Sequence, residues 1–230
     1  MFATSVSPED VSTRDFAGRW FFCDDGWFGT LTLATVGDHD LSGTFSSDRF
    51  DEDFRVTARV GMPGEPHAIQ LDIHDFNWMP AQHYVGRIFT RSRGMIAGSS
   101  EWQNIPFGFF ASRATRPPLG TYRAGVVRGE DFAGSWTAYL DGEPATIALE
   151  FDPESATLRG SCTSGPTAYE VIGNPGGTAS HEISLSLYAP DDGTVAATLS
   201  GYLMSRPKNA ICGTITVADA RRGFVLVRYA

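Results

Sequence analysis

The chain has 230 residues and a formal net charge of −9, with a sequence pI near 4.9. Hydrophobic residues make up 42% and charged residues 20% of it, which is a globular composition and excludes a disordered or fibrous protein. The acidic balance provides no basic stripe for a phosphate backbone, so we expect no nucleic-acid partner. The 25 glycines and 13 prolines predict many short strands joined by turns.

The first fourteen residues, 1–14, form a predicted N-terminal tail. They lack a positively charged segment followed by an apolar one, so we expect no secretory signal. No apolar run approaches the roughly 20 residues that span a bilayer. A cytoplasmic protein without a membrane span is therefore expected. The three cysteines have no CxxC spacing and predict neither a disulfide framework nor a zinc site.

An internal repeat organises the rest of the chain. The sequence DFAGRW at 15–20 recurs as DFAGSW at 131–136, an offset of 116 residues. Further matches follow in the same order: 41–44 with 158–161, 67–71 with 181–185, 96–98 with 211–213, and 108–109 with 223–224. This order indicates a tandem duplication. We expect one domain over 15–114, a linker over 115–130, and a second domain over 131–230.

Each unit reads as a series of short strands. In the first unit, segments separated by Gly, Pro, Asp and Asn cover 17–25, 28–36, 40–47, 53–61, 67–75, 83–90, 94–100 and 106–113. Apolar and polar residues alternate over 54–60 and 69–74, as strands buried on one side require. The predicted fold class is all-β, with two tandem eight-stranded antiparallel up-and-down β-barrels, because closure removes exposed edges. A β-sandwich is the alternative.

The residues at the start of each unit resemble those of a known family. Gly18-Arg19-Trp20, then 29–33 and 41–47, resemble the opening of an avidin-like barrel of the calycin superfamily, and lipocalins share the G-x-W feature. Gly134-Ser135-Trp136 begins a second, weaker copy. The resemblance implies a calycin-like barrel with a ligand cavity at one mouth. The residues that contact biotin in that family differ here, and Ser47 alone matches.

Barrel geometry sorts side chains by parity. If Trp20 points inward, as the resemblance implies, Phe22 and Asp24 do too, and Phe45, Ser47 and Phe54 share the interior. The predicted ligand-binding residues are Trp20, Phe22, Phe45, Ser47, Phe54, Trp78 and Trp102. The alternatives are that Trp20 and Trp136 plug the barrel floors, and that the phenylalanines only pack a core.

The two units differ in composition. The first holds four of the five tryptophans and four of the five histidines. Its segment 74–83 is rich in aromatic and histidine residues and is expected to contact a ligand or a partner subunit. The second unit is expected to be structural or to hold a second site. Cys162 aligns with Phe45 and Cys212 with Ala97, so both cysteines are expected inside the second barrel.

These observations favour a protein that binds a small apolar or amphipathic molecule in the first barrel. One alternative is a cofactor-independent, lipocalin-like isomerase or cyclase that acts on a hydrophobic substrate; another is a self-associating structural module, and a homo-oligomer stays open. The candidate acids and bases are Asp24, His83, Arg87 and Glu101. No motif predicts a metal, a cofactor or a nucleophilic serine.

Overall fold

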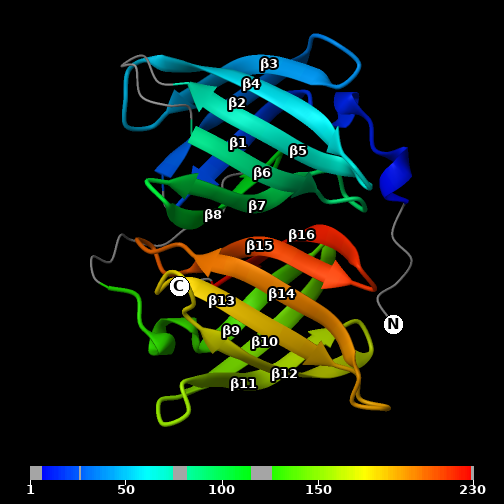
Figure 1. Cartoon of the computed structure of the whole chain (residues 1–230), viewed down its shortest axis with the longest axis vertical. Coiled ribbons are helices and arrows are strands. Elements are labelled where there is room, and N and C mark those ends of the chain that lie inside the picture. Colours follow the sequence, from blue (N-terminus) through cyan, green and yellow to red (C-terminus); the bar gives the residue numbers. More distant parts are fainter. Residues whose placement is uncertain (1–6, 26, 75–81, 115–125, 229–230) are drawn as a thin grey trace.

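The computed structural model describes residues 7–25, 27–74, 82–114 and 126–228. The chain is all-β and forms two closed eight-stranded antiparallel barrels in tandem (Figure 1). Consecutive strands pair along the chain, and the last strand of each barrel pairs with the first. The predicted fold class and the internal repeat are therefore confirmed. Within the described residues, no helix is long and apolar enough to cross a membrane.

The first barrel contains the strands of the first repeat. They are β1 Gly18–Asp24, β2 Trp27–Thr35, β3 Asp40–Ser47, β4 Asp53–Met62, β5 Glu65–His74, β6 Gln82–Ile88, β7 Met95–Trp102 and β8 Ile105–Ser112. Alternation decides which face is buried: along β4, Val56, Ala58 and Val60 are buried while Arg55 and Arg59 are exposed. The predicted parity of this strand is correct.

The second barrel repeats the arrangement. Its strands are β9 Gly134–Leu140, β10 Glu143–Asp152, β11 Thr157–Ser164, β12 Thr167–Pro175, β13 Glu182–Tyr188, β14 Val195–Leu203, β15 Ala210–Val217 and β16 Ala220–Val227. Asp141 and Gly142 join β9 to β10 with φ of 52° and 86°. Two consecutive positive φ values in a two-residue loop match the twist of the flanking strands, which explains this Asp-Gly pair.

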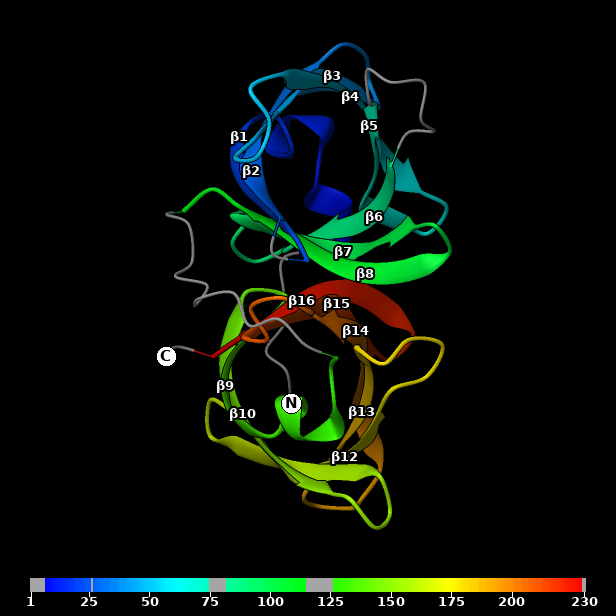
Figure 2. The same ribbon diagram turned by 90° about the vertical axis from the view of Figure 1, so that its left-hand side faces the viewer.

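Short 3₁₀ segments lie at one end of each barrel (Figure 2). The first barrel has η1 Pro8–Asp10 and η2 Thr13–Asp15, and the second has η3 Gly129–Phe132. The G-x-W tryptophans are held from these segments. Trp20 Nε1 donates to Phe16 O at 2.8 Å, and Trp136 Nε1 donates to Phe132 O at 2.9 Å. Both tryptophans are fully buried. They fill the barrel floors.

An arginine from the last strand region of each unit stacks on its tryptophan. The guanidinium carbon of Arg113 lies 4.1 Å from a ring centroid of Trp20, and that of Arg228 lies 4.4 Å from one of Trp136. Arg113 also donates to the carbonyls of Asp15 and Ala17, both at 2.7 Å. The stacked arginine therefore ties the end of each barrel to its beginning.

The two barrels pack against each other through β6, β7 and β8 of the first and β14, β15 and β16 of the second. A separate apolar cluster lies between them, built from Cys23, Phe89, Ala97, Phe110, Met204, Ala210, Cys212, Val225 and Val227. Gly108 permits this close approach, because a Cβ there would lie 2.7 Å from Cys212 Sγ. The barrel interface is thus a third packed core.

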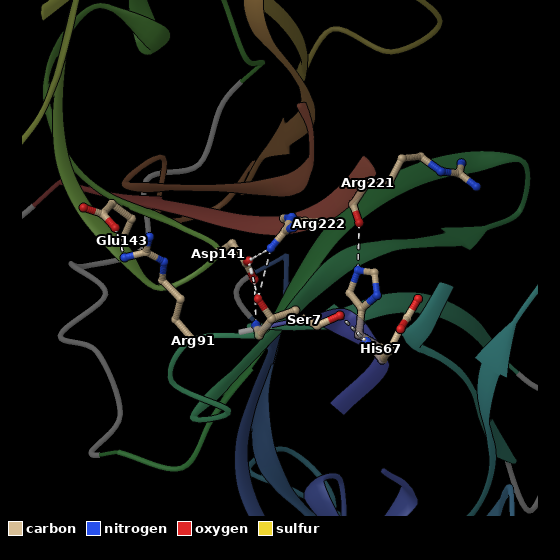
Figure 3. Close-up of polar contacts among 9 residues, drawn as sticks. Ser7, His67, Arg91, Asp141, Glu143, Arg221 and Arg222 are labelled. Atoms are coloured by element: carbon tan, nitrogen blue, oxygen red, sulfur yellow. Dashed lines mark hydrogen bonds and ion pairs between the residues drawn. The ribbon is translucent and has the colours of Figure 1, made fainter. Parts of the chain in front are cut away.

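Some of the polar contacts across the interface occur in symmetric pairs, and Figure 3 shows one contact of such a pair, between His67 and Arg221. His67 Nε2 donates to Arg221 O at 2.7 Å. In the other direction, His181 Nε2 donates to Pro106 O at 2.6 Å. Strand pairing makes position 181 the equivalent of 67 and position 221 the equivalent of 106. The two hydrogen bonds are therefore exchanged by a pseudo-twofold axis.

A second pair of contacts obeys the same symmetry. Thr90 donates its amide and hydroxyl to Asp141, at 2.7 and 2.6 Å. The equivalent Ser205 donates its amide and hydroxyl to Asp25. Two repeats joined by reciprocal contacts have the geometry of an isologous dimer within one chain.

The cysteines correct one expectation. Cys162 is buried in the second barrel's core, but Cys212 lies between the barrels. Neighbouring Ile211 points into the second barrel, and successive strand residues face opposite sides. Cys212 was therefore assigned to the wrong side of the sheet.

Both thiols are expected to react slowly with iodoacetamide in the native protein. Burial raises the pKa of Cys162 to about 12 and that of Cys212 well above its usual value, and the thiolate is the reactive form. Mass spectrometry of timed reactions, with urea-unfolded protein as the control, measures the rates. Complete labelling of either cysteine within the time that labels the unfolded chain would contradict its burial.

Candidate functional site

A polar cluster lies inside the otherwise apolar first barrel. Asp24 ends β1 and is 6% exposed. Its Oδ2 accepts hydrogen bonds from Gln82 Nε2 at 2.8 Å and from the Tyr84 hydroxyl at 3.0 Å. Its Oδ1 accepts one from the Ser100 hydroxyl at 3.3 Å. Strands β6 and β7 thus bring three neutral donors to the buried carboxyl at the end of β1.

The surroundings of Asp24 disfavour its charged form. The pKa of Asp24 is raised to about 7, mainly by burial and to a smaller extent by the charge of neighbouring Asp25, against the lowering effect of its three hydrogen-bond donors. The same burial, together with Asp24, raises the pKa of Tyr84 well above its usual value. Both protonation states of Asp24 are therefore populated near neutral pH, while Tyr84 stays protonated.

Aromatic side chains surround this carboxyl. The ring centroid of Phe22 lies 5.3 Å from those of Phe45 and Tyr84 and 5.5 Å from that of Phe109. Tyr84 and Phe109 meet edge to face at 5.1 Å. These spacings are those of favourable aromatic pairs. We call Phe22, Phe45, Tyr84 and Phe109 the aromatic cluster.

The aromatic contacts continue from this cluster to the surface. Phe45 is followed by Phe54 at 6.2 Å, and Phe54 by Phe50 at 5.8 Å. Phe50 is 51% exposed and contacts the ring of Trp27 at 5.6 Å. Trp27 Nε1 in turn donates to Ser47 Oγ at 2.7 Å. A chain of aromatic rings therefore runs from solvent to the residues around Asp24.

The second barrel shows what the fold requires at these positions. Tyr84 pairs with Ser100 across β6 and β7, and Leu199 pairs with Ile215 across β14 and β15 in the same register. The full set of equivalents is Asp24 and Leu140, Gln82 and Ala197, Tyr84 and Leu199, Ser100 and Ile215. The second barrel closes with aliphatic residues at all four positions, so the fold itself does not need the polar cluster.

Part of the aromatic cluster is also particular to the first barrel, although Phe109 corresponds to Phe224. Phe22 and Phe45 correspond to Ala138 and Cys162. Phe50 lies in the connection 48–52 between β3 and β4, whereas only residues 165–166 join β11 to β12. The segment that carries the exposed end of the aromatic chain is therefore longer in the first barrel.

Five of the predicted ligand-binding residues lie in the first barrel's interior or at its Asp24 end. Phe22, Phe45 and Ser47 are buried, as expected from their inward parity, and Phe54 is partly buried against the same core. Trp20 is also inside, but on the floor beneath Arg113. Trp102, at the end of β7, is 36% exposed. Trp78 lies outside the described residues.

Of the four candidate acids and bases, only Asp24 belongs to the polar cluster. His83 lies on the outer face, where its ring contacts Asp72 and its side chain is 73% exposed. Glu101 follows Ser100 and therefore points away from the interior, and it is exposed. Glu101 therefore does not join Asp24 in the interior of the barrel.

Arg87 is buried, but between the barrels. Its Nε donates to Glu65 at 2.8 Å and its Nη1 to Thr214 Oγ1 at 3.1 Å. Glu65 also accepts from Arg221 Nε at 2.6 Å. This arginine joins β5 and β6 to the second barrel, so it does not reach the polar cluster.

Sequence reasoning missed Tyr84 and Ser100, and it included Gln82 only as part of the segment 74–83. Their signal is present in the aligned repeats, because each is polar where the second unit has an aliphatic residue. Searching the inward positions of β6 and β7 for such differences would have found them. Among the described residues, no group of three or more His, Cys, Asp or Glu side chains is placed to hold a metal ion.

Comparisons with known proteins leave the function open. No protein-family model matches the chain, and no curated protein matches it. Among solved structures, it is similar to a protein of unknown function from the DUF3598 family of Nostoc punctiforme PCC 73102. That match has 12% sequence identity and a TM-score of 0.31, and it covers 93% of this chain and 95% of the other. Functional assignment therefore depends on the residues of the site.

Proposed function

We propose that the first barrel binds a small apolar or amphipathic molecule against the aromatic cluster, with a polar group of the ligand at Asp24. The observation that carries this proposal is the polar cluster around Asp24, which has aliphatic counterparts throughout the second barrel. The avidin-like and lipocalin-like resemblance of the G-x-W segment supports it, since barrels of the calycin superfamily hold ligands inside.

The physical reason is the cost of burying this carboxyl. An ionised group moved from water into an apolar interior is destabilising unless it is paired. Leucine at the same position in the second barrel avoids that cost. The fold therefore does not require a buried carboxyl at this position. A destabilising buried carboxyl beside aromatic side chains that reach the surface is typical of a binding or catalytic site.

Binding is testable with N-phenyl-1-naphthylamine, a neutral fluorescent probe of apolar sites. Wild-type protein is expected to bind it, and Phe45→Ala to weaken binding by about 1–3 kcal/mol if the ring is largely buried against the probe. Cys162→Ala, at the equivalent position of the second barrel, is the matched control and should leave the affinity unchanged. Fluorescence titration measures both.

Two results would contradict the assignment. One is the absence of probe binding by the folded wild-type protein. The other is an equal loss of affinity in the Phe45 and Cys162 variants, since a site in the first barrel should respond to only one of them.

The second candidate function is acid–base catalysis on a hydrophobic substrate, as in a cofactor-independent isomerase or cyclase. It is favoured by the pKa of about 7 for Asp24 and by the phenol of Tyr84 at 3.0 Å, because a general acid or base works best with a pKa near the operating pH. Deuterium uptake from solvent into a bound ketone, abolished in Asp24→Asn, would distinguish catalysis from binding alone.

A further inference from the structure

The two oxygens of Asp24 are unequally satisfied. Oδ2 accepts two hydrogen bonds of ordinary length, at 2.8 and 3.0 Å. Among the described residues, Oδ1 accepts only the longer bond from Ser100, at 3.3 Å. A carboxylate offers about four acceptor positions. Oδ1 therefore retains the capacity to accept a strong hydrogen bond from a further donor.

The described groups that hydrogen-bond to Asp24 supply no positive charge. Gln82 and Ser100 are neutral donors, and Tyr84 stays protonated. On the neighbouring strands, Trp27 of β2 and Phe109 of β8 pair with Asp24. The like charge of the adjacent Asp25 raises the pKa of Asp24. Within the part of the chain that the structure describes, no Lys, Arg or His hydrogen-bonds to this carboxyl.

The aromatic cluster adds the second element of cation recognition. Aromatic ring faces attract an organic cation, and the attraction grows when the cation is removed from water. Phe22 lies within ring contact of Phe45, Tyr84 and Phe109, and Tyr84 also contacts the carboxyl. A ligand that reaches Oδ1 would therefore meet both a negative charge and ring faces. A carboxylate ligand would instead meet like charge.

We propose that the first barrel binds a protonated organic amine with an apolar body, whose ammonium group donates to Asp24 Oδ1 while the body packs on the aromatic cluster. This inference depends on the proposed function, because it names the ligand class of the same site. It also gives the ligand a defined role: its ammonium group supplies a positive charge that no described residue places in hydrogen-bond contact with Asp24.

The experiment compares two probes with one body, 2-(1-naphthyl)ethylamine and 2-(1-naphthyl)ethanol, by isothermal titration calorimetry at pH 8. The amine is expected to bind wild-type protein about tenfold or more tightly than the alcohol, through a charge-assisted hydrogen bond. In Asp24→Asn this preference should fall to about equal affinity while the alcohol still binds. Glu101→Gln removes an exposed carboxylate nearby and is the matched control; it should keep the preference.

The pH dependence gives a second readout. Lowering the pH from 8 to 5.5 protonates Asp24, so the amine should lose about tenfold or more in affinity while the alcohol changes little. Equal affinity of the two probes for the wild type, or a preference that survives Asp24→Asn, would overturn the amine assignment. Alcohol binding without amine preference overturns this inference alone, whereas failure of both probes and of N-phenyl-1-naphthylamine overturns the proposed function as well.

Discussion

Replacing Asp24 with Asn is expected to remove a large, pH-dependent loss of stability. The pKa of Asp24 is raised to about 7 in the folded protein, above the value near 3.9 of an unfolded chain. Between these values the folded state binds more protons than the unfolded state, so the free energy of unfolding falls as the pH rises. The slope is about 1.4 kcal/mol per pH unit. From pH 5 to pH 8 the wild type should lose about 2–3 kcal/mol that the variant retains.

Urea unfolding followed by circular dichroism at pH 5, 6, 7 and 8 measures this effect. The difference between wild type and Asp24→Asn cancels the titration of groups that both proteins share. Glu101→Gln serves as the control and should follow the wild-type curve. Parallel curves for the wild type and the Asn variant would show that Asp24 titrates as an ordinary exposed carboxyl and would remove the basis for a buried polar site.

The largest loss of stability is expected from Trp136→Ala. Trp136 is fully buried on the floor of the second barrel, and truncating such a residue typically costs about 3–5 kcal/mol. Phe132 O would also lose its donor, and Arg228 would lose the ring on which it stacks. Chemical denaturation should show an unfolding free energy lower by about that amount.

The same variant separates structure from binding. In the fraction that remains folded, the affinity for N-phenyl-1-naphthylamine should match that of the wild type, because Trp136 belongs to the second barrel's core. Trp20→Ala is the matched comparison, since Trp20 has the equivalent place in the first barrel. A small stability change for Trp136→Ala, or a selective loss of probe affinity, would mean that this tryptophan has been given the wrong role.

Local patterns predicted the architecture because barrel strands depend on local alternation. The internal repeat predicted two domains of similar length, and the alternation over 54–60 predicted which side chains of that strand face inward. Since the side-chain period of a strand is two, one inward residue determines the parity of its neighbours. That rule placed Asp24 beside Phe22 inside the first barrel, as the structure shows.

Strand parity could not predict which outward-facing side chains are buried and which are exposed. Cys212 and Arg87 are buried although they point away from both barrel interiors, because the second barrel covers that face of the first. His83 and Glu101 have outward parity on a face that stays exposed. An outward residue is thus buried or exposed according to the packing of a distant segment, which a local pattern does not contain.

By itself, then, the sequence determined the duplication, from matches between the two units, and the β class and the inward face of the alternating strands, from short-range periodicity and turn chemistry. It favoured closed barrels over a β-sandwich, and the structure decided between them. Only the tertiary structure decided which inward side chains meet. Asp24 and Tyr84 lie sixty positions apart along the chain, and closure of the barrel brings them to hydrogen-bonding distance. The pseudo-twofold contact between the barrels also depends on the tertiary structure, because its paired hydrogen bonds join residues that lie far apart in the sequence, in different repeats.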